Sequence, residues 1–209
     1  DVDILARAEE EWMKFFSRPD AEKKTYAGKG GRGGPTDSLM LWGNGYSVYR
    51  AVRHQFHVVL GDADAQQWPS EEARRLALEL AERMKRHCTG VLSKLAPEVE
   101  RRRSETEAED GDPSVLDIFW YPNADEENSV SGGNMSDHVD PGLLTIEAPS
   151  CVPGLDCFDG RDWVAVEQPE YATRGQLIMF CGEDLEISSG KVVRATRHRV
   201  SRPKAGSDG

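Results

Sequence analysis

A histidine and an aspartate stand two residues apart in the stretch SDHVDPGLLTI, which runs from Ser136 to Ile146. On an extended backbone, residues i and i+2 point to the same face, so His138 and Asp140 would present an imidazole and a carboxylate side by side. Pro141 and Gly142 then predict a sharp turn, which places the pair near a strand end. The pattern indicates part of a metal site, although a surface loop with a capping aspartate would show the same letters.

A third ligand has to come from a distant strand, and the other histidines are the candidates. His54, His57 and His87 fall in a part of the chain that we predict to be helical. His198 lies in KVVRATRHRVS, which we predict to be a late strand. A second strand of the same barrel could therefore bring His198 beside the first pair. Two histidines and one carboxylate on one face form the facial triad of non-haem Fe(II) oxygenases, which leaves the opposite coordination positions open.

The first half of the chain, residues 1–111, has mainly helical patterns. Apolar residues of DILARAEEEWMKFF recur at three- and four-residue spacing, and we expect this helix to stop near Ser17 because Pro19 follows. The glycine-rich stretch 27–35 lacks the pattern of a phosphate-binding loop and predicts a plain loop. A short hairpin or bend is expected around Asn44 and Gly45.

A long helix is predicted after WPSEEARR, with Ser70 as its N-terminal cap and Pro97 at its end or at a bend. The acidic stretch 104–112 that follows is interpreted as a solvated linker.

Residues 112–209 have the texture of a β protein. Short segments with a period of two alternate with turn signals such as FDGRDW and SSGK. The predicted strands are SVLDIFWYP, GLLTIEA, WVAVE, GQLIMF and KVVRATRHRV. Strands of this length and spacing favour a sandwich or a barrel.

The overall composition limits the classes of function. A net charge of −11 argues against a nucleic-acid partner, because phosphate binding needs a basic surface. No apolar run approaches the roughly 18 to 20 residues that cross a membrane. The four cysteines form no C-x-x-C pair, which favours reduced thiols and a cytoplasmic location. We expect a monomer, and we expect the chain, which begins with Asp1, to be a piece of a longer protein.

The stretch HVDPGLLTI…PGLDCFDGRDWVAVE…GQLIMFCGEDLEISSGKVVRATRHRV resembles the C-terminal half of the 2-oxoglutarate- and Fe(II)-dependent dioxygenases, in particular the isopenicillin N synthase-like group. EEEWMKFFSRPDAEKKTYA is similar to the helical leader of that group. The resemblance implies a mainly β fold with N-terminal helices (α+β), built on a double-stranded β-helix (jelly-roll) core. It also implies that residues 1–111 are the helical region and that 112–209 hold the oxygenase core.

The resemblance also implies roles for individual residues. His138, Asp140 and His198 would be the iron ligands, and Tyr121 of FWYP would contact 2-oxoglutarate. The chain departs from the family pattern where Phe119 replaces an asparagine, and the tail HRVSRPKAGSDG contains no R-x-S anchor for 2-oxoglutarate. We expect that this anchor lies beyond the last residue; otherwise the protein does not use 2-oxoglutarate in the usual way.

The activity that the resemblance implies is the oxidation of a small organic substrate by Fe(II), 2-oxoglutarate and O2, with release of succinate. Two alternatives stay open. One is an Fe(II) oxidase of the same fold that does not need 2-oxoglutarate, and the other is a jelly-roll scaffold that binds without catalysis.

Overall fold

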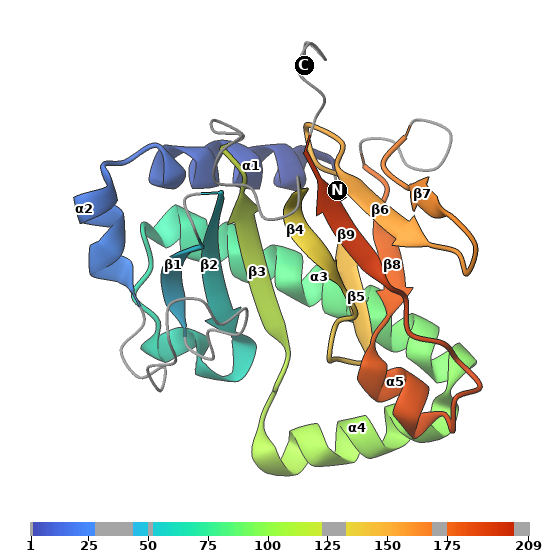
Figure 1. Ribbon diagram of the computed structural model, residues 1–209. Helices are drawn as coiled ribbons and strands as arrows, with labels where there is room; N and C mark the ends of the chain where they lie inside the picture. Colours follow the sequence, from blue (N-terminus) through green and yellow to red (C-terminus); the bar gives the residue numbers. More distant parts are fainter. Residues whose placement is uncertain (1, 28–43, 50–51, 123–132, 169–174, 203–209) are drawn as a thin grey trace. The chain divides into compact units, whose positions relative to one another are not determined.

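The computed structural model describes residues 2–27, 44–49, 52–122, 133–168 and 175–202 (Figure 1). The chain divides into two compact units: residues 3–83 and 104–128 belong to the first, and 84–103 and 129–209 to the second. The elements of the first unit outside helices α3 and α4 are α1 (Val2–Phe16), α2 (Asp20–Lys23), η1 (Lys24–Tyr26), β1 (Gly45–Tyr49), β2 (Arg53–Val59), η2 (Leu60–Ala65) and β3 (Val115–Trp120).

Helix α1 forms for the reason that its sequence indicates. Its apolar residues fall on one stripe, and that stripe is buried in the core of the first unit. The buried residues of α1 are Ile4, Ala8, Trp12, Phe15 and Phe16. The helix ends at Phe16, in agreement with the predicted stop near Ser17.

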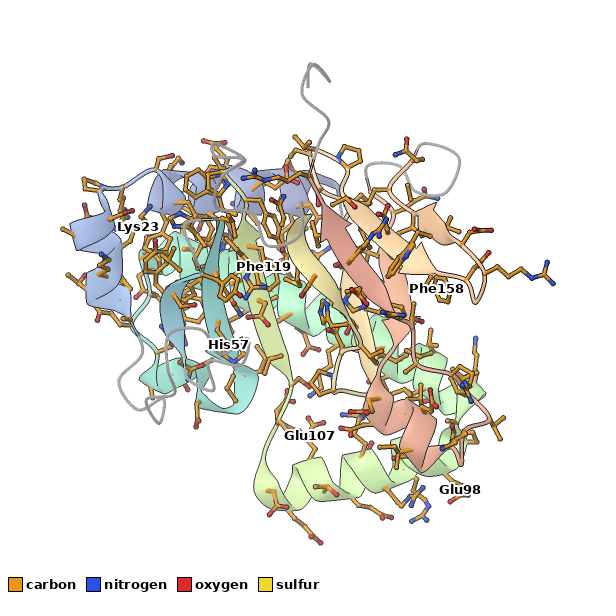
Figure 2. The ribbon with its side chains drawn as sticks, viewed as in Figure 1. Lys23, His57, Glu98, Glu107, Phe119 and Phe158 are labelled. Carbon is orange, nitrogen blue, oxygen red and sulfur yellow. The ribbon has the colours of Figure 1, made fainter. Side chains whose placement is uncertain are left out.

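The first unit also contains a three-stranded antiparallel sheet in the order β1-β2-β3. The expectation that this part of the chain is helical was therefore incomplete, and His54 and His57 lie on strand β2. The hairpin turn falls between Tyr49 and Arg53. The chain bends at Asn44, so of the two alternatives expected around Asn44 and Gly45 the bend is confirmed and the hairpin is not. His57 is labelled in Figure 2, and its Nδ1 lies 2.7 Å from Asp117 Oδ1 on the neighbouring strand.

The two units do not follow the expected division at residue 111. Strand β3 comes after that point, yet it pairs with β2 from Val115 to Trp120. Hydrogen bonding between strands distant in sequence therefore holds β3 in the first unit, and this is a pairing that local patterns do not encode. The predicted loop 27–35 lies almost entirely outside the described residues.

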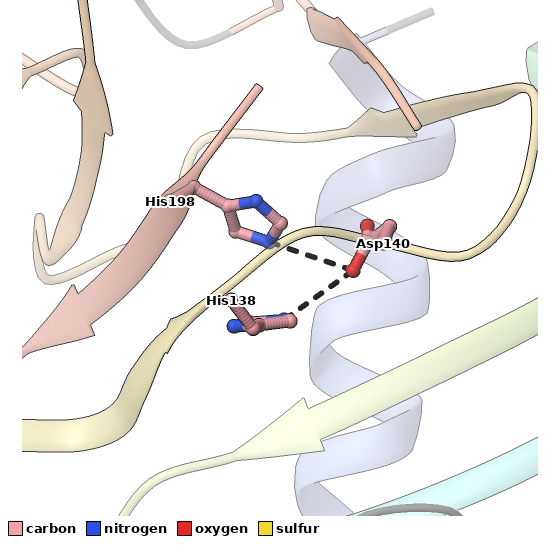
Figure 3. A group of neighbouring side chains, drawn as sticks. All are labelled: His138, Asp140 and His198. Carbon is pink, nitrogen blue, oxygen red and sulfur yellow. Dashed lines mark ion pairs between the residues drawn. The ribbon is translucent and has the colours of Figure 1, made fainter. Parts of the chain in front are cut away.

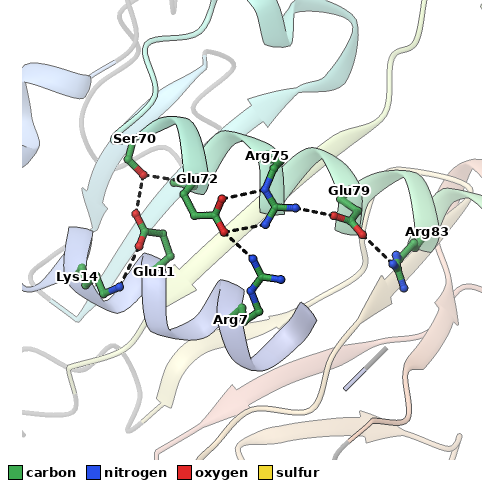
Figure 4. Close-up of polar contacts among 9 residues, drawn as sticks. Arg7, Glu11, Lys14, Ser70, Glu72, Arg75, Glu79 and Arg83 are labelled. Atoms are coloured by element: carbon green, nitrogen blue, oxygen red, sulfur yellow. Dashed lines mark hydrogen bonds and ion pairs between the residues drawn. The ribbon is translucent and has the colours of Figure 1, made fainter. Parts of the chain in front are cut away.

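Helix α3 (Glu71–Leu95) begins where the sequence predicts. The backbone N–H of Ala73 donates to Ser70 Oγ at 3.0 Å, which confirms Ser70 as the cap. Ser70 Oγ also donates to Glu11 on α1, and Arg7 pairs with Glu72 at 2.9 Å (Figure 4). These ion pairs are largely exposed and contribute little to stability individually.

Helix α4 (Pro97–Asp110) replaces the linker that we predicted for the acidic stretch. Proline is favoured in the first turn of a helix, and the residues after it include strong helix formers. Arg101 pairs with Glu98 at 3.1 Å and Arg103 with Glu100 at 2.7 Å, both three residues apart. Such pairs stabilise a helix that is polar on nearly all faces. The prediction of a linker rested on composition alone and did not take these pairs into account.

Besides parts of α3 and α4, the described residues of the second unit form six strands and a short helix. They are β4 (Gly133–His138), β5 (Leu144–Glu147), β6 (Leu155–Phe158), β7 (Trp163–Ala165), β8 (Ile178–Cys181), α5 (Glu183–Ser188) and β9 (His198–Ser201). One sheet has the order β4-β9-β6-β7, and β5 pairs with β8 in a second sheet. The predicted Asp-Gly hairpin connects β6 to β7, where Gly160 has a positive φ of 101°.

Strand β9 is shorter than predicted because the chain before it bonds to other elements. The backbone N–H of Thr196 donates to the carbonyl of Cys181 at 2.8 Å, and that of Ala195 donates to Glu186 Oε2 at 2.8 Å. The strand therefore begins only at His198. Among the described residues, no helix is both long and apolar enough to cross a membrane.

Candidate metal centre

The centre is formed where β4 ends and β9 begins. His138 is the last residue of β4 and pairs directly with His198, the first residue of β9, so both imidazoles lie on the same face of the sheet. Asp140 follows two residues after His138, before the bend at Pro141. The predicted turn therefore directs the carboxylate back towards the two rings.

Three side chains converge at this point (Figure 3). Asp140 Oδ1 lies 3.3 Å from His138 Nε2 and 3.6 Å from His198 Nε2. The two imidazole centroids are 4.2 Å apart. The ligand atoms all lie within 4.8 Å of one another, and this is the one such group of histidine, cysteine and acidic residues among the described part of the chain.

Both imidazoles are oriented by backbone carbonyls. His138 Nδ1 lies 2.9 Å from the carbonyl oxygen of Ser136, and His198 Nδ1 lies 3.2 Å from that of Thr196. A carbonyl oxygen can only accept, so the proton is placed on Nδ1 in each ring. Nε2 of each ring then faces Asp140, and it is the atom that can coordinate a metal in place of a proton.

Thr145 on β5 holds the carboxylate from the other side. Its hydroxyl donates to Asp140 Oδ2 at 2.5 Å, which leaves Oδ1 facing the imidazoles. Burial alone would raise the pKa of Asp140, but hydrogen bonds from His138 and Thr145 and the nearby histidine charges outweigh it and lower that pKa. The group is therefore an anion at neutral pH, as a ligand must be.

His198 is the most deeply buried of the three residues, with 5% of its surface exposed. Burial lowers its pKa, because the charged imidazolium loses hydration, although Asp140 opposes this effect. The ring of Phe180 packs against it at 4.4 Å between centroids. His198 is thus held neutral, with its lone pair available to a metal.

The turn that carries Asp140 is fixed by its contact with the start of α5. The backbone N–H of Glu183 donates to the carbonyl of Asp140 at 2.8 Å. A Cβ placed on Gly182 would lie 2.1 Å from the carbonyl oxygen of Gly142 and 2.9 Å from that of Asp140. The residue at this position must therefore be glycine for the turn to lie so close.

The donor set fits a divalent transition metal. Ligand atoms about 2.1 Å from one ion and about 90° apart lie about 3 Å from each other. The separations of 3.3 Å and 3.6 Å from Asp140 to the imidazoles are close to that value. Two neutral imidazoles with one carboxylate on one side form the ligand type of non-haem Fe(II) centres.

Tyr121 was the remaining candidate that the family resemblance indicated. Tyr121 directly follows β3 in the first unit and stacks on Phe119, with centroids 6.0 Å apart. Its contact with 2-oxoglutarate stays a prediction from the family resemblance. Two arginines that precede His198 are ion-paired: Arg194 with Glu186 and Arg197 with Asp137.

Sequence reasoning missed the residues that position the ligands. Thr145 stood in a motif quoted for its resemblance, but no local signal showed that its hydroxyl would meet Asp140. Gly182 was also part of such a motif, and only the close approach of the turn explains it. These roles depend on contacts between segments about 40 residues apart or on the folded turn, which a linear pattern does not show.

The architecture and the ligand group define a class: β-sheet proteins that carry a two-histidine, one-carboxylate centre. Residues 114–208 match the model of the 2OG-Fe(II) oxygenase superfamily.

Comparisons with individual proteins agree with this match. Jasmonate-induced oxygenase 4 of Arabidopsis thaliana is 25% identical over 211 residues, which cover 94% of this chain and 56% of that protein. Flavone synthase of Petroselinum crispum is 30% identical over 204 residues, which cover 90% of this chain and 54% of that protein. The chain therefore spans about half the length of these curated relatives.

Solved structures show the same fold. The 2-oxoglutarate complex of dioxygenase for auxin oxidation 1 from Arabidopsis thaliana superimposes with a TM-score of 0.73 at 19% identity, covering 98% of this chain and 75% of that one. The expected fold, mainly β with N-terminal helices on a double-stranded β-helix core, is thereby confirmed.

Proposed function

We propose that this chain is part of a non-haem Fe(II)- and 2-oxoglutarate-dependent dioxygenase that oxidises a small organic substrate. The observation that carries the proposal is the group of His138, Asp140 and His198, which lies inside the superfamily match. The names of similar proteins, a flavone synthase and a dioxygenase for auxin oxidation, support a small organic substrate.

His138, Asp140 and His198 would hold the iron, and the chain's own contacts prepare them for it. The carbonyls of Ser136 and Thr196 can accept from Nδ1 of the two rings, which leaves both Nε2 atoms to coordinate the metal. Bound iron would supply the activation of O2, coupled to decarboxylation of 2-oxoglutarate and oxidation of the substrate.

The residues around the ligands restrict water. Phe180 covers the buried ring of His198, and only 6% of the surface of Phe180 is exposed. An apolar wall beside the ligands lowers the local dielectric, which strengthens each electrostatic contact within the site.

The expected partners and location form part of the proposal. The net charge of −11 favours a small-molecule substrate over a nucleic acid. All four cysteines are free thiols, which favours a reducing compartment such as the cytoplasm. We also propose that the protein acts as a monomer.

An anaerobic titration tests the proposed function. The protein is loaded with Fe(II), 2-oxoglutarate is added, and the visible metal-to-ligand charge-transfer band is followed. His138→Ala is the test variant, and His87→Ala is its matched control because His87 is an exposed histidine on α3, outside the ligand group.

We expect the band in the wild type and in His87→Ala, and we expect it to be absent in His138→Ala. Iron binding without the band would favour an oxidase that does not use 2-oxoglutarate. Absence of iron binding by the wild type would leave a non-catalytic scaffold and overturn the proposal.

A further inference from the structure

Glu147 ends strand β5 on the face that is turned to the metal centre. Neighbouring residues of a strand point to opposite faces. Leu144 and its partner Cys181 pack into the apolar cluster of the second unit, so they define the outer face. Thr145 and its partner Phe180 lie on the opposite face, where they contact the proposed iron ligands. Glu147 is two residues beyond Thr145 and therefore shares the inner face.

The second sheet places a further residue around the same space. Cys157 on β6 pairs directly with His198, so its thiol lies on the inner face of that sheet. Burial and then the charge of Glu147 raise the pKa of Cys157 to about 11. The carboxyl group of Glu147 is thus within electrostatic reach of the inner faces of both sheets.

Within the described part of the chain, the side chain of Glu147 forms no hydrogen bond and no ion pair. The contrast with Glu167 is direct, because the Glu167 carboxylate accepts from the backbone N–H groups of Ser150, Gly154 and Leu155 at 2.5, 2.6 and 2.7 Å. Glu167 is a structural clamp with its oxygens occupied. Glu147 has oxygens free to receive a ligand group.

Among the described residues, the charged groups that act on Glu147 are negative. Burial, followed by the charges of Glu167 and Asp140, raises its pKa to about 8. If iron and 2-oxoglutarate bind as proposed above, the two carboxylates of 2-oxoglutarate and that of Asp140 leave the loaded site net negative by formal charge. A ligand that brings a cation would compensate this charge and would also favour the ionised form of Glu147.

We propose that Glu147 is a substrate-binding residue that selects substrates with a basic nitrogen, an ammonium or a guanidinium group. This inference rests on the proposed function, because it places the substrate beside the iron ligands. A carboxylate on a rigid strand can pair with such a group in a charge-assisted, bidentate manner. The apolar part of the substrate would lie against Phe180.

Two matched probes test the proposal: benzylguanidine, which is a cation, and benzylurea, its neutral counterpart. A guanidinium group also has no basic lone pair with which to bind the iron. Binding is measured by calorimetry to the Fe(II)- and 2-oxoglutarate-loaded protein without oxygen, and again to the metal-free protein. The variants are Glu147→Gln, Glu147→Asp and the exposed control Glu109→Gln.

We expect the wild type, Glu147→Asp and Glu109→Gln to bind benzylguanidine at least about tenfold more tightly than benzylurea, since charge-assisted hydrogen bonds are worth about 1.5 to 3 kcal/mol. Glu147→Gln should lose that preference and keep the charge-transfer band. Equal binding of the two probes to the wild type, no binding of either, or an unchanged preference in Glu147→Gln would overturn the inference.

The two proposals fail in different ways. Absence of the charge-transfer band in the wild type is a failure of the proposed function, whereas a normal band without a guanidinium preference is a failure of the role of Glu147 alone. The binding of the two probes to the metal-free protein shows whether Glu147 prefers the guanidinium, with or without a charge-transfer band in the loaded protein.

Discussion

At the scale of single residues, the metal centre depends on groups that do not touch the metal. Thr145 donates to one oxygen of Asp140, and two backbone carbonyls set the protons of the imidazoles. Partners of this kind orient the ligands before metal binds, so the orientation does not have to be established during binding.

Replacing Thr145 by valine tests whether its hydroxyl orients Asp140 for metal binding. Valine keeps the shape of threonine but removes the donor to Asp140 Oδ2. We expect Fe(II) affinity to fall by about 10- to 100-fold, which is typical for the loss of such a partner. Calorimetric titration with Fe(II) measures it, and Thr145→Ser, which keeps the hydroxyl, should bind as the wild type does. Equal affinities in the valine variant and the wild type would show that the hydrogen bond does not contribute.

Glu147 makes stability depend on pH. Its pKa rises from an ordinary 4.5 to about 8 in the folded protein. Between these values the unfolded chain loses the proton while the folded chain keeps it, so stability falls as pH rises through this window. Its stabilising contribution is complete below pH 4.5 and is lost once the pH exceeds about 8.

Glu147→Gln cannot titrate and should lack this dependence. Denaturation of the metal-free protein by urea at pH 5 and pH 9 is the measurement. We expect the free energy of unfolding of Glu147→Gln, relative to that of the wild type, to increase from pH 5 to pH 9. The increase should be at most about 1.4 kcal/mol for each pH unit within the window. Glu109→Gln should show the same difference from wild type at both pH values. If the difference in the free energy of unfolding between Glu147→Gln and the wild type does not change with pH, the raised pKa is contradicted.

At the scale of elements, the position of Asp140 is set by the contact between its turn and the start of α5. Gly182 permits this contact, since any Cβ there would meet the backbone of the turn. The backbone cannot yield cheaply, unlike the far end of a side chain.

Gly182→Ala should therefore displace the turn, with a loss of at least about 2 kcal/mol of stability and of most Fe(II) affinity. Gly90→Ala is the matched control, because a Cβ there has nothing within 4 Å. Since Gly90 lies in helix α3, that change should stabilise the protein by about 0.5 to 1 kcal/mol. Urea denaturation and Fe(II) titration report the two effects, and a stable Gly182→Ala variant with normal iron binding would refute the argument.

At the scale of the whole molecule, metal binding should raise stability, because the ligand group exists only in the folded protein. A metal at about 100 times its Kd stabilises the folded state by about 2.7 kcal/mol. For a chain of this size that corresponds to an increase in Tm of about 5 to 10 °C. Thermal melts under nitrogen, with Fe(II) and then with excess chelator, measure the increase and its reversal.

Asp140→Asn is the test variant for this increase, since it removes the anionic ligand while keeping the size of the side chain. We expect it to melt at the same temperature with and without Fe(II). An equal increase in Asp140→Asn and the wild type would place the binding of the metal elsewhere in the chain.

The sequence alone was sufficient for the features that local rules control. The i, i+2 spacing of His138 and Asp140, the Pro-Gly turn after them and the Ser70 cap involve neighbours within a few residues, and the structure has each of them. Alternation of apolar residues also predicted β3, β5, β7 and β8, because a half-buried strand has a period of two.

Tertiary structure alone decided the rest. Residues 45–59 became a hairpin because β2 could pair with β3 about 60 positions later, and the chain before His198 bonded to β8 and α5 and so did not extend the strand. The convergence of His198 with the first pair and the contacts of Thr145 and Gly182 likewise needed folded neighbours. Local sequence specifies which chemical groups are present. Pairing and packing between distant segments specify which of these groups meet, because those contacts depend on the register of whole strands.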